Sequence, residues 1–164
     1  MEIVDEDGCA LPTGKVGEVV ITPMAIEGMP LIWYKTGDIS FLMDKLCKCG
    51  RLSPRLGPIL GRKKQLMKVK GTSLYPQSVY AALDEIDQVL DYCLVVTREG
   101  ALSDKLTIHV AVKGGNVTGE WLEEQLVARL RVKPVVVIES QKEIKERIFL
   151  PQSRKPVRFV DGRR

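Results

Sequence analysis

Two patterns of hydrophobic residues follow one another along the chain, and the change falls near residue 62. Before it, short apolar runs at residues 17–22 and 31–34 predict strands, and a stretch with two prolines and a glycine at 51–58 predicts a loop. This segment contains no run with the 3.6-residue repeat of a helix of useful length. It is too small to close a core alone, so we expect a β-rich edge of a larger domain.

After residue 62 the chain alternates between strand and helix patterns. Apolar runs, one of them strictly alternating, predict strands at 65–69, 89–96, 106–112 and 135–138, the last of them buried. Residues 71–73 predict a turn after the first strand.

Two helices are predicted between these strands. Pro76 suits a first helical position, and apolar residues follow it at helical spacing, namely Val79, Leu83 and Ile86. Thr118 is the expected N-cap of a second helix with leucines at every fourth position, which Pro134 is expected to end. The order β-α-β-β-α-β over residues 65–138 predicts a small ferredoxin-like, two-layer α/β sandwich, and hence an α+β chain overall.

Composition narrows the class of protein without choosing a function. The 164 residues are 45% hydrophobic and 28% charged, as in globular domains, with a net charge of +4. The basic residues are dispersed, so we expect no nucleic-acid partner. No apolar run is long enough to cross a bilayer and the first residues are acidic, which predicts a cytoplasmic protein without a membrane partner.

Motifs in a fixed order give the chain a family resemblance. The run Trp-Tyr-Lys-Thr-Gly-Asp at 33–38 and the run Gly-Arg-Lys-Lys at 61–64 resemble the last nucleotide-contacting segments of adenylate-forming acyl-CoA ligases. Leu-Tyr-Pro at 74–76 and the tail at 150–161 resemble the phenylacetate-CoA ligase branch of that superfamily. The resemblance spans residues 17–161. It implies that residues 1–62 end an N-terminal adenylation domain and that 63–164 form its C-terminal lid domain.

The resemblance also implies roles for single residues. Asp38 would bind the ribose diol of the nucleotide, and Arg62 its ribose or phosphate. Lys64 would be the hinge residue whose backbone rotation re-aims the lid, and Gly71 would lie near the coenzyme A tunnel. Read without the resemblance, Asp38 is a turn aspartate after a glycine, residues 62–64 are a solvated basic loop, and Gly71 is an ordinary turn glycine.

Lys155 is the predicted catalytic residue. The family's tail leads through Leu-Pro-x-Ser to a lysine that stabilises negative charge during adenylation, and Lys155 stands at that place. This chain lacks the family's glycine before the lysine, and Pro156 follows it. The register therefore leaves Arg154 and Arg158 as alternatives, beside a merely solvated basic tail.

The Cys-Lys-Cys-Gly run at 47–50 predicts half of a zinc site. Cys47 and Cys49 would supply two thiolates, and ligands outside this chain would complete a tetrahedral Zn²⁺. A pair of reduced structural thiols is the alternative. His109 is expected to be an ordinary strand residue and Cys93 a buried thiol.

Two functions of different classes follow. In the first, the chain is part of a phenylacetate-CoA ligase that uses ATP, with Mg²⁺, to make an acyl-AMP from phenylacetate or a related aryl acid and transfers the acyl group to coenzyme A. No phosphate loop or aromatic-rich acyl pocket is present, so an upstream ligase domain is the expected partner and the chain alone is expected to be inactive. In the second, it is a stand-alone ferredoxin-like module that binds a small ligand or forms a homodimer through an exposed sheet edge.

Overall fold

The computed structural model describes every residue except 46, 51, 101, 116, 152 and 164. It divides the chain into two compact units, Met1–Gln65 and Leu66–Arg164, called here the first and the second unit. The pattern change near residue 62 lies close to this division. That the two units are the end of an adenylation domain and a lid domain stays a prediction.

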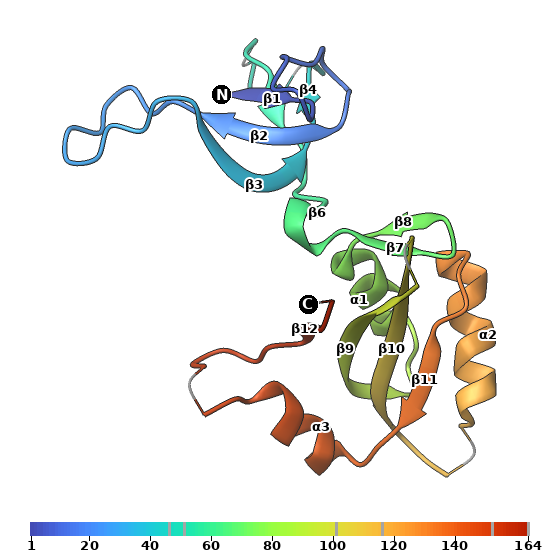
Figure 1. Cartoon of the computed structure of the whole chain (residues 1–164). Coiled ribbons are helices and arrows are strands. Elements are labelled where there is room, and N and C mark those ends of the chain that lie inside the picture. The colour runs from blue at the N-terminus through green and yellow to red at the C-terminus, as the bar shows by residue number, and fades with distance from the viewer. Residues whose placement is uncertain (46, 51, 101, 116, 152, 164) are drawn as a thin grey trace. The chain divides into compact units, whose positions relative to one another are not determined.

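The first unit is built on a four-stranded sheet in the order β1-β2-β3-β6 (Figure 1). Its antiparallel pairs bury five hydrophobic side chains among the described residues, namely Ile3, Val4, Val19, Val20 and Ile39. The elements of this unit are β1 (Glu2–Val4), β2 (Gly17–Ile21), β3 (Tyr34–Ser40), β4 (Leu42–Met43), β5 (Arg55–Leu56), β6 (Gly61–Arg62) and the 3₁₀ turn η1 (Lys63–Gln65).

Strand β3 corrects the strand prediction for residues 31–34. The strand begins at Tyr34 and continues through Gly37 and Asp38 to Ser40, where turn residues were expected. Gly37 has a φ of 77°, and the register against β2 shifts nearby, between Glu18 and Val20. A glycine in a strand is typical of such a bulge, so it bends β3 and does not end it.

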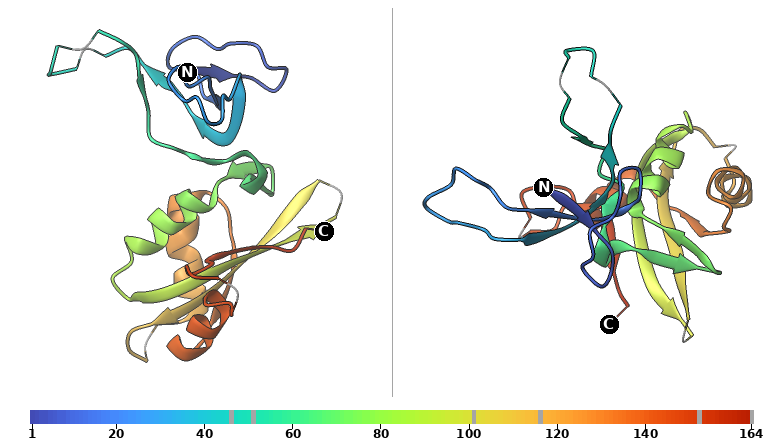
Figure 2. Two further views of the ribbon diagram at one scale, coloured as in Figure 1. Left: turned by 90° about the vertical axis from the view of Figure 1, so that its left-hand side faces the viewer. Right: turned by 90° about the horizontal axis from the view of Figure 1, so that it is seen from above.

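The second unit is built on a mixed sheet in the order β11-β10-β9-β12. Its two long central strands are antiparallel, and each edge strand runs parallel to its neighbour (Figures 1 and 2). The strands are β9 (Val89–Glu99), β10 (Ser103–Val112), β11 (Val135–Ile138) and β12 (Phe159–Asp161).

Three helices cover the two faces of this sheet. α1 (Pro76–Asp84) and α2 (Gly119–Leu130) join the main core on one face, and α3 (Gln141–Ile148) packs on the other through Ile144 and Ile148. Figure 1 shows α2 and α3 on opposite sides of β9 and β10. The predicted two-layer sandwich is therefore wrong in one respect, because α3 adds a third layer.

A hairpin precedes the sheet instead of joining it. β7 (Met67–Val69) pairs with β8 (Thr72–Leu74), and β12 takes the fourth place in the sheet beside β9. The turn consists of Lys70 and Gly71, with φ of 46° and 84°. The turn predicted at 71–73 therefore starts one residue late, and its last two residues belong to strand β8. Positive φ at both central residues is typical of a type I′ hairpin turn, in which glycine is favoured.

The predictions for the helices and the last strand had mixed outcomes. Pro76 does open α1, and the Thr118 hydroxyl accepts a hydrogen bond from the Trp121 amide at 3.2 Å, as expected of an N-cap. The end predicted at Pro134 is wrong, because α2 ends at Leu130 and Arg131 leaves it with a φ of 59°. β11 is a strand as predicted, but it is an edge strand and mostly exposed, not buried.

Candidate functional site

Strand pairing brings Asp38 and Arg62 together, two dozen residues apart in the chain. They are direct cross-strand partners in the β3–β6 ladder, and Arg62 Nε lies 3.3 Å from Asp38 Oδ1. The two side chains are 30% and 69% exposed, and an exposed pair of this kind contributes about 0.2–1 kcal/mol. The carboxylate and the guanidinium can therefore turn to a ligand at small cost.

Thr36 fixes the backbone that carries Asp38. Its hydroxyl donates to the Val19 carbonyl at 3.0 Å and accepts from the Asp38 amide at 3.1 Å. These bonds tie β3 to β2 next to the bulge and leave the Asp38 side chain at the surface of the sheet. A carboxylate held in this way can accept two hydrogen bonds from a diol.

A second ion pair adjoins Arg62, and sequence reasoning missed it. Lys63 Nζ lies 3.0 Å from Glu18 Oε2, and Glu18 is one of the few buried charged residues described. The hydrogen bond to Glu18 raises the pKa of the Lys63 ammonium. The pair anchors η1 to β2 immediately before Lys64, an exposed residue of η1. No spacing rule links positions 18 and 63, so the sequence carried no signal for it.

Gly71 lies in the second unit, at the tip of the β7–β8 hairpin. A side chain built on it would meet no atom within 4 Å, although its φ of 84° would strain any residue with a Cβ. The space beside the glycine is open, so a ligand can approach the protein backbone at this turn. The turn geometry alone also explains why glycine stands here.

Lys155 is exposed in the stretch between α3 and β12, which we call the Lys155 loop (residues 149–158). Its backbone is ordered by Ser153, whose hydroxyl donates to the Lys155 carbonyl at 2.6 Å and accepts from the Lys155 amide at 3.3 Å. Among the described residues, no hydrogen bond or ion pair engages the Lys155 ammonium. The hydrogen bonds of Ser153 thus fix the backbone at Lys155, while the lysine itself is exposed.

The structure separates Lys155 from one of its two alternatives. Arg158 is engaged within the fold, since its Nη2 lies 3.1 Å from Asp91 Oδ1 and its guanidinium lies over the Tyr92 ring at 5.1 Å. Its departure would break the ion pair with Asp91 and the cation–π contact with Tyr92. Arg154 is exposed like Lys155, so the register between these two stays open.

Cys47 and Cys49 of the first unit lie close together. The Cys49 and Cys47 sulfurs lie 3.0 Å apart, and the contact lowers the pKa of the Cys47 thiol, which favours the thiolate that metals bind. Within the part of the chain that is described, no third histidine, cysteine or carboxylate joins them. The residues present fit two of the four ligands of a zinc ion.

His109 and Cys93 are cross-strand partners in β9 and β10. Cys93 is fully buried against α3, which raises the pKa of its thiol, as expected for a buried structural cysteine. His109 Nδ1 lies 2.7 Å from Glu139 Oε1, and Arg147 of α3 binds the same carboxylate at 2.7 Å. Because a carboxylate only accepts, Nδ1 carries the proton, and the histidine helps to attach α3 to the sheet.

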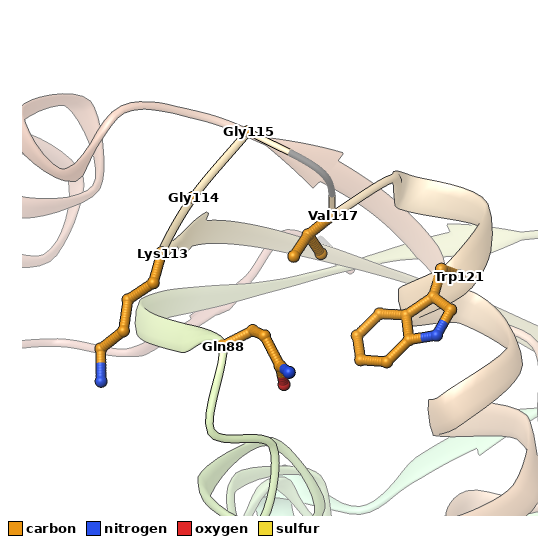
Figure 3. A pocket seen from close by; sticks show the side chains of 6 residues that line it. All are labelled: Gln88, Lys113, Gly114, Gly115, Val117 and Trp121. Atoms are coloured by element: carbon orange, nitrogen blue, oxygen red, sulfur yellow. The ribbon is translucent and has the colours of Figure 1, made fainter.

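A pocket of about 400 Å³ in the second unit involves none of the predicted site residues. It lies where β10 turns toward α2, and its lining is shown in Figure 3: Gln88, Lys113, Gly114, Gly115, Val117 and Trp121. The Trp121 ring and the Gln88 amide face the hollow.

No helix among the described residues is long and apolar enough to span a bilayer.

The chain was compared with known proteins. No protein-family model matches the chain. It is 47% identical over 105 residues to the phenylacetate-coenzyme A ligase of Thermus thermophilus, an alignment that covers 63% of this chain and 24% of the relative. The corresponding enzyme of Pseudomonas putida is 30% identical over 114 residues, covering 68% and 25%. The chain spans about a quarter of the length of the curated relatives it matches.

A solved structure supports the fold. The crystal structure of 2-hydroxyisobutyryl-CoA ligase, in the postadenylation state with an acyl-AMP, superposes with a TM-score of 0.82 at 24% identity. The match covers 99% of this chain and 35% of that one. The α+β architecture of this chain is therefore also the fold of a part of that ligase. The predicted resemblance to phenylacetate-CoA ligases is confirmed by the curated relatives.

Proposed function

Because the chain is a partial, C-terminal homologue of the phenylacetate-coenzyme A ligases, we propose that it performs the nucleotide-contacting and lid functions of such an enzyme. The complete ligase joins phenylacetate or a related aryl acid to the α-phosphate of ATP, which gives an acyl-adenylate and releases pyrophosphate. It then passes the acyl group to the thiol of coenzyme A and releases AMP. An upstream ligase domain supplies the phosphate loop and the acyl pocket. Mg²⁺ enters with ATP, and the chain alone is inactive.

The pairing of Asp38 with Arg62 is the observation that carries this proposal. Two residues to which the resemblance assigns the same nucleotide meet at 3.3 Å through a strand pairing that the sequence did not predict. The Asp38 carboxylate accepts hydrogen bonds from the hydroxyl groups of the ribose. Arg62, released from the carboxylate, contacts the ribose or the phosphate with its guanidinium.

The second unit supplies the mobile half of the mechanism. Lys155 places a positive charge where negative charge grows as the carboxylate of the acid attacks the α-phosphate, and its effect is electrostatic. Lys64 is the hinge at which the second unit rotates after adenylation. The rotation brings Gly71 toward the pantetheine thiol, where the absence of a Cβ lets the ligand approach.

Cys47 and Cys49 hold a structural Zn²⁺ only when ligands from outside this chain join them. A zinc ion bound there would fix the loop between β4 and β5 and takes no part in the chemistry proposed here. Zinc analysis of the chain and of a complete ligase that contains it separates this role from a reduced thiol pair.

A chimera tests the function. This chain replaces the matched part of the Thermus thermophilus ligase, and the truncated host without it gives the baseline. We expect a folded chimera to form acyl-AMP and acyl-CoA from phenylacetate. Lys155→Ala should slow acyl-AMP formation about 10²–10³-fold while sparing thioester formation from preformed acyl-AMP.

Lys142→Ala is the matched control, since this α3 lysine is exposed, pairs with Glu146 of its own helix and is not a predicted site residue. Its chimera should behave as the unmodified one. A folded chimera with no acyl-AMP above the baseline would refute the proposal, and equal loss of both half-reactions in Lys155→Ala would refute the role of Lys155. AMP formation by the purified chain alone would contradict its dependence on an upstream domain.

A further inference from the structure

Two charged residues of opposite sign meet, largely buried, beside strand β7. The side chains of Arg163 and Asp104 are 16% and 11% exposed, and Nη1 lies 3.1 Å from Oδ2. Asp104 also accepts the Lys68 amide at 2.8 Å, and Arg163 Nη1 donates to the Leu66 carbonyl at 2.6 Å. Buried charges are tolerated where they are paired and hydrogen-bonded, as both are here.

The same guanidinium also binds Asp161, the last residue of β12. Arg163 Nε and Nη2 donate to the two carboxylate oxygens of Asp161 at 2.8 and 2.6 Å, a two-point contact that lysine cannot reproduce. The Gly162 amide, between them, donates to the Val96 carbonyl of β9 at 2.8 Å. Arg163 therefore connects β12 with β7 and β10, and we call this arrangement the Arg163 clamp (Arg163, Asp104 and Asp161).

The clamp matters for the Lys155 loop, because β12 is the loop's far end. The near end follows α3, where the Val157 amide returns to the Ile148 carbonyl at 2.7 Å. β12 itself has only three residue pairs with β9, and a strand that short holds its place weakly. Arg158, the last residue of the loop, is held by its ion pair with Asp91 at 3.1 Å. Contacts beyond β12 add a second attachment at this end of the loop.

We propose that Arg163, through its pair with Asp104, is a positioning residue for Lys155, and this rests on the proposed function of the chain. The clamp fixes β12 on the sheet, and the sheet-bound strand fixes the place of the lysine. A charge stabilises a transition state only if it is held where the new charge develops, so a loosened loop loses rate without losing the lysine.

Amide hydrogen exchange on the chain itself tests the clamp. The reporters are the Leu94 amide, which donates to the Arg158 carbonyl, and the Gly162 amide. We expect Arg163→Ala to speed exchange at both about tenfold or more, with no change in the centre of β10. Asp104→Asn, which keeps the acceptor for Lys68, should have a similar effect, and the double variant should add little to either single one.

Arg129→Ala is the matched control, since it removes an arginine and an ion pair with Glu85 at 3.4 Å, but on the exposed face of α2. It should leave both reporters unchanged. Arg163→Lys keeps the charge and should restore part of the protection. Unchanged reporters in Arg163→Ala would overturn the clamp.

Half-reactions in the chimera test the link to Lys155. Arg163→Ala should lower kcat for acyl-AMP formation about tenfold to a hundredfold, keep KM for ATP within about twofold and spare thioester formation. Equal losses in both half-reactions would show general damage and overturn the positioning role. A folded but inactive parent chimera removes the proposed function and this role together, whereas an active chimera unaffected by Arg163→Ala removes this role alone.

Discussion

The first and second units carry comparable functional assignments on very different cores. Among the described residues, the first unit buries five hydrophobic side chains, while one continuous cluster of the second unit contains seventeen buried residues. The first unit also exposes large apolar residues between β2 and β3, with Met24 at 93%, Met29 at 68% and Ile32 at 84%. The Asp38–Arg62 pair, proposed to bind the nucleotide, thus lies on the unit that buries little, and the Lys155 loop lies on the unit that has its own core.

This difference separates two ways of holding a functional residue. Asp38 and Arg62 are placed by neighbouring strands, and their unit requires further covering of its apolar surface, because a few buried side chains do not offset the conformational entropy of 65 residues. Lys155 is placed by a loop that runs from helix α3 to strand β12, both of which belong to the second unit. The proposed lid role requires a unit that turns as a rigid body, and the separate core of the second unit is compatible with that role.

Separating the units should give the largest effect. Residues 66–164, expressed alone, should unfold cooperatively in urea, whereas residues 1–65 alone should show no cooperative transition. Circular dichroism against urea measures both. A cooperative transition in residues 1–65 would show that its five buried side chains suffice, and the contrast between the units would disappear.

Truncating one core side chain should give a smaller loss. Leu126 is fully buried in α2, so Leu126→Ala should lower the free energy of unfolding of the second unit by about 2–5 kcal/mol. Ile32→Ala in the first unit removes a side chain that is already exposed and should change stability by less than about 0.5 kcal/mol. Urea midpoints of the full chain, read with a probe in each unit, give both values. A large effect of Ile32→Ala would mean that the β2–β3 loop is covered in solution.

Local patterns predicted the parts of the fold that local physics decides. The alternation in β10, the leucine stripe of α2, its Thr118 cap and Pro76 at the start of α1 depend on residues a few positions apart, and all were found. Helix α3 was missed although its signal was present. Ser140 and Glu143 form a reciprocal capping box, the usual mark of a helix start.

The remaining errors came from contacts between distant residues. β12 has only three residues and becomes a strand because β9 accepts it, 65 positions earlier in the register. β7 and β8 form a hairpin where one strand and a turn were expected, and the type I′ turn at Lys70 was the overlooked cue. In the site, the sequence named Asp38 and Arg62 only through a family resemblance. Their contact comes from the pairing of β3 with β6, in a stretch where local patterns predicted a turn at Gly37.

The smallest expected effects are on how stability depends on pH. They should appear at acid pH in the second unit and at alkaline pH in the first. In the second unit, the hydrogen bonds from Arg147, with a further contribution from His109, lower the pKa of the Glu139 carboxyl below its usual 4.5. This pair stabilises the fold above that pH, and the contribution is lost as the pH falls through the lowered value. Glu139→Gln should remove this acid dependence.

In the first unit the hydrogen bond to Glu18 raises the pKa of Lys63 above its usual 10.5. Its contribution is present below that pH and is lost as the pH rises through the raised value, so Glu18→Gln should flatten the alkaline side only. Stability against pH for both variants, with a probe in each unit, makes the comparison direct. An acid effect of Glu139→Gln on the first unit's probe would mean that the two units share their stability, and the contrast between a second unit with its own core and a dependent first unit would then have to be given up.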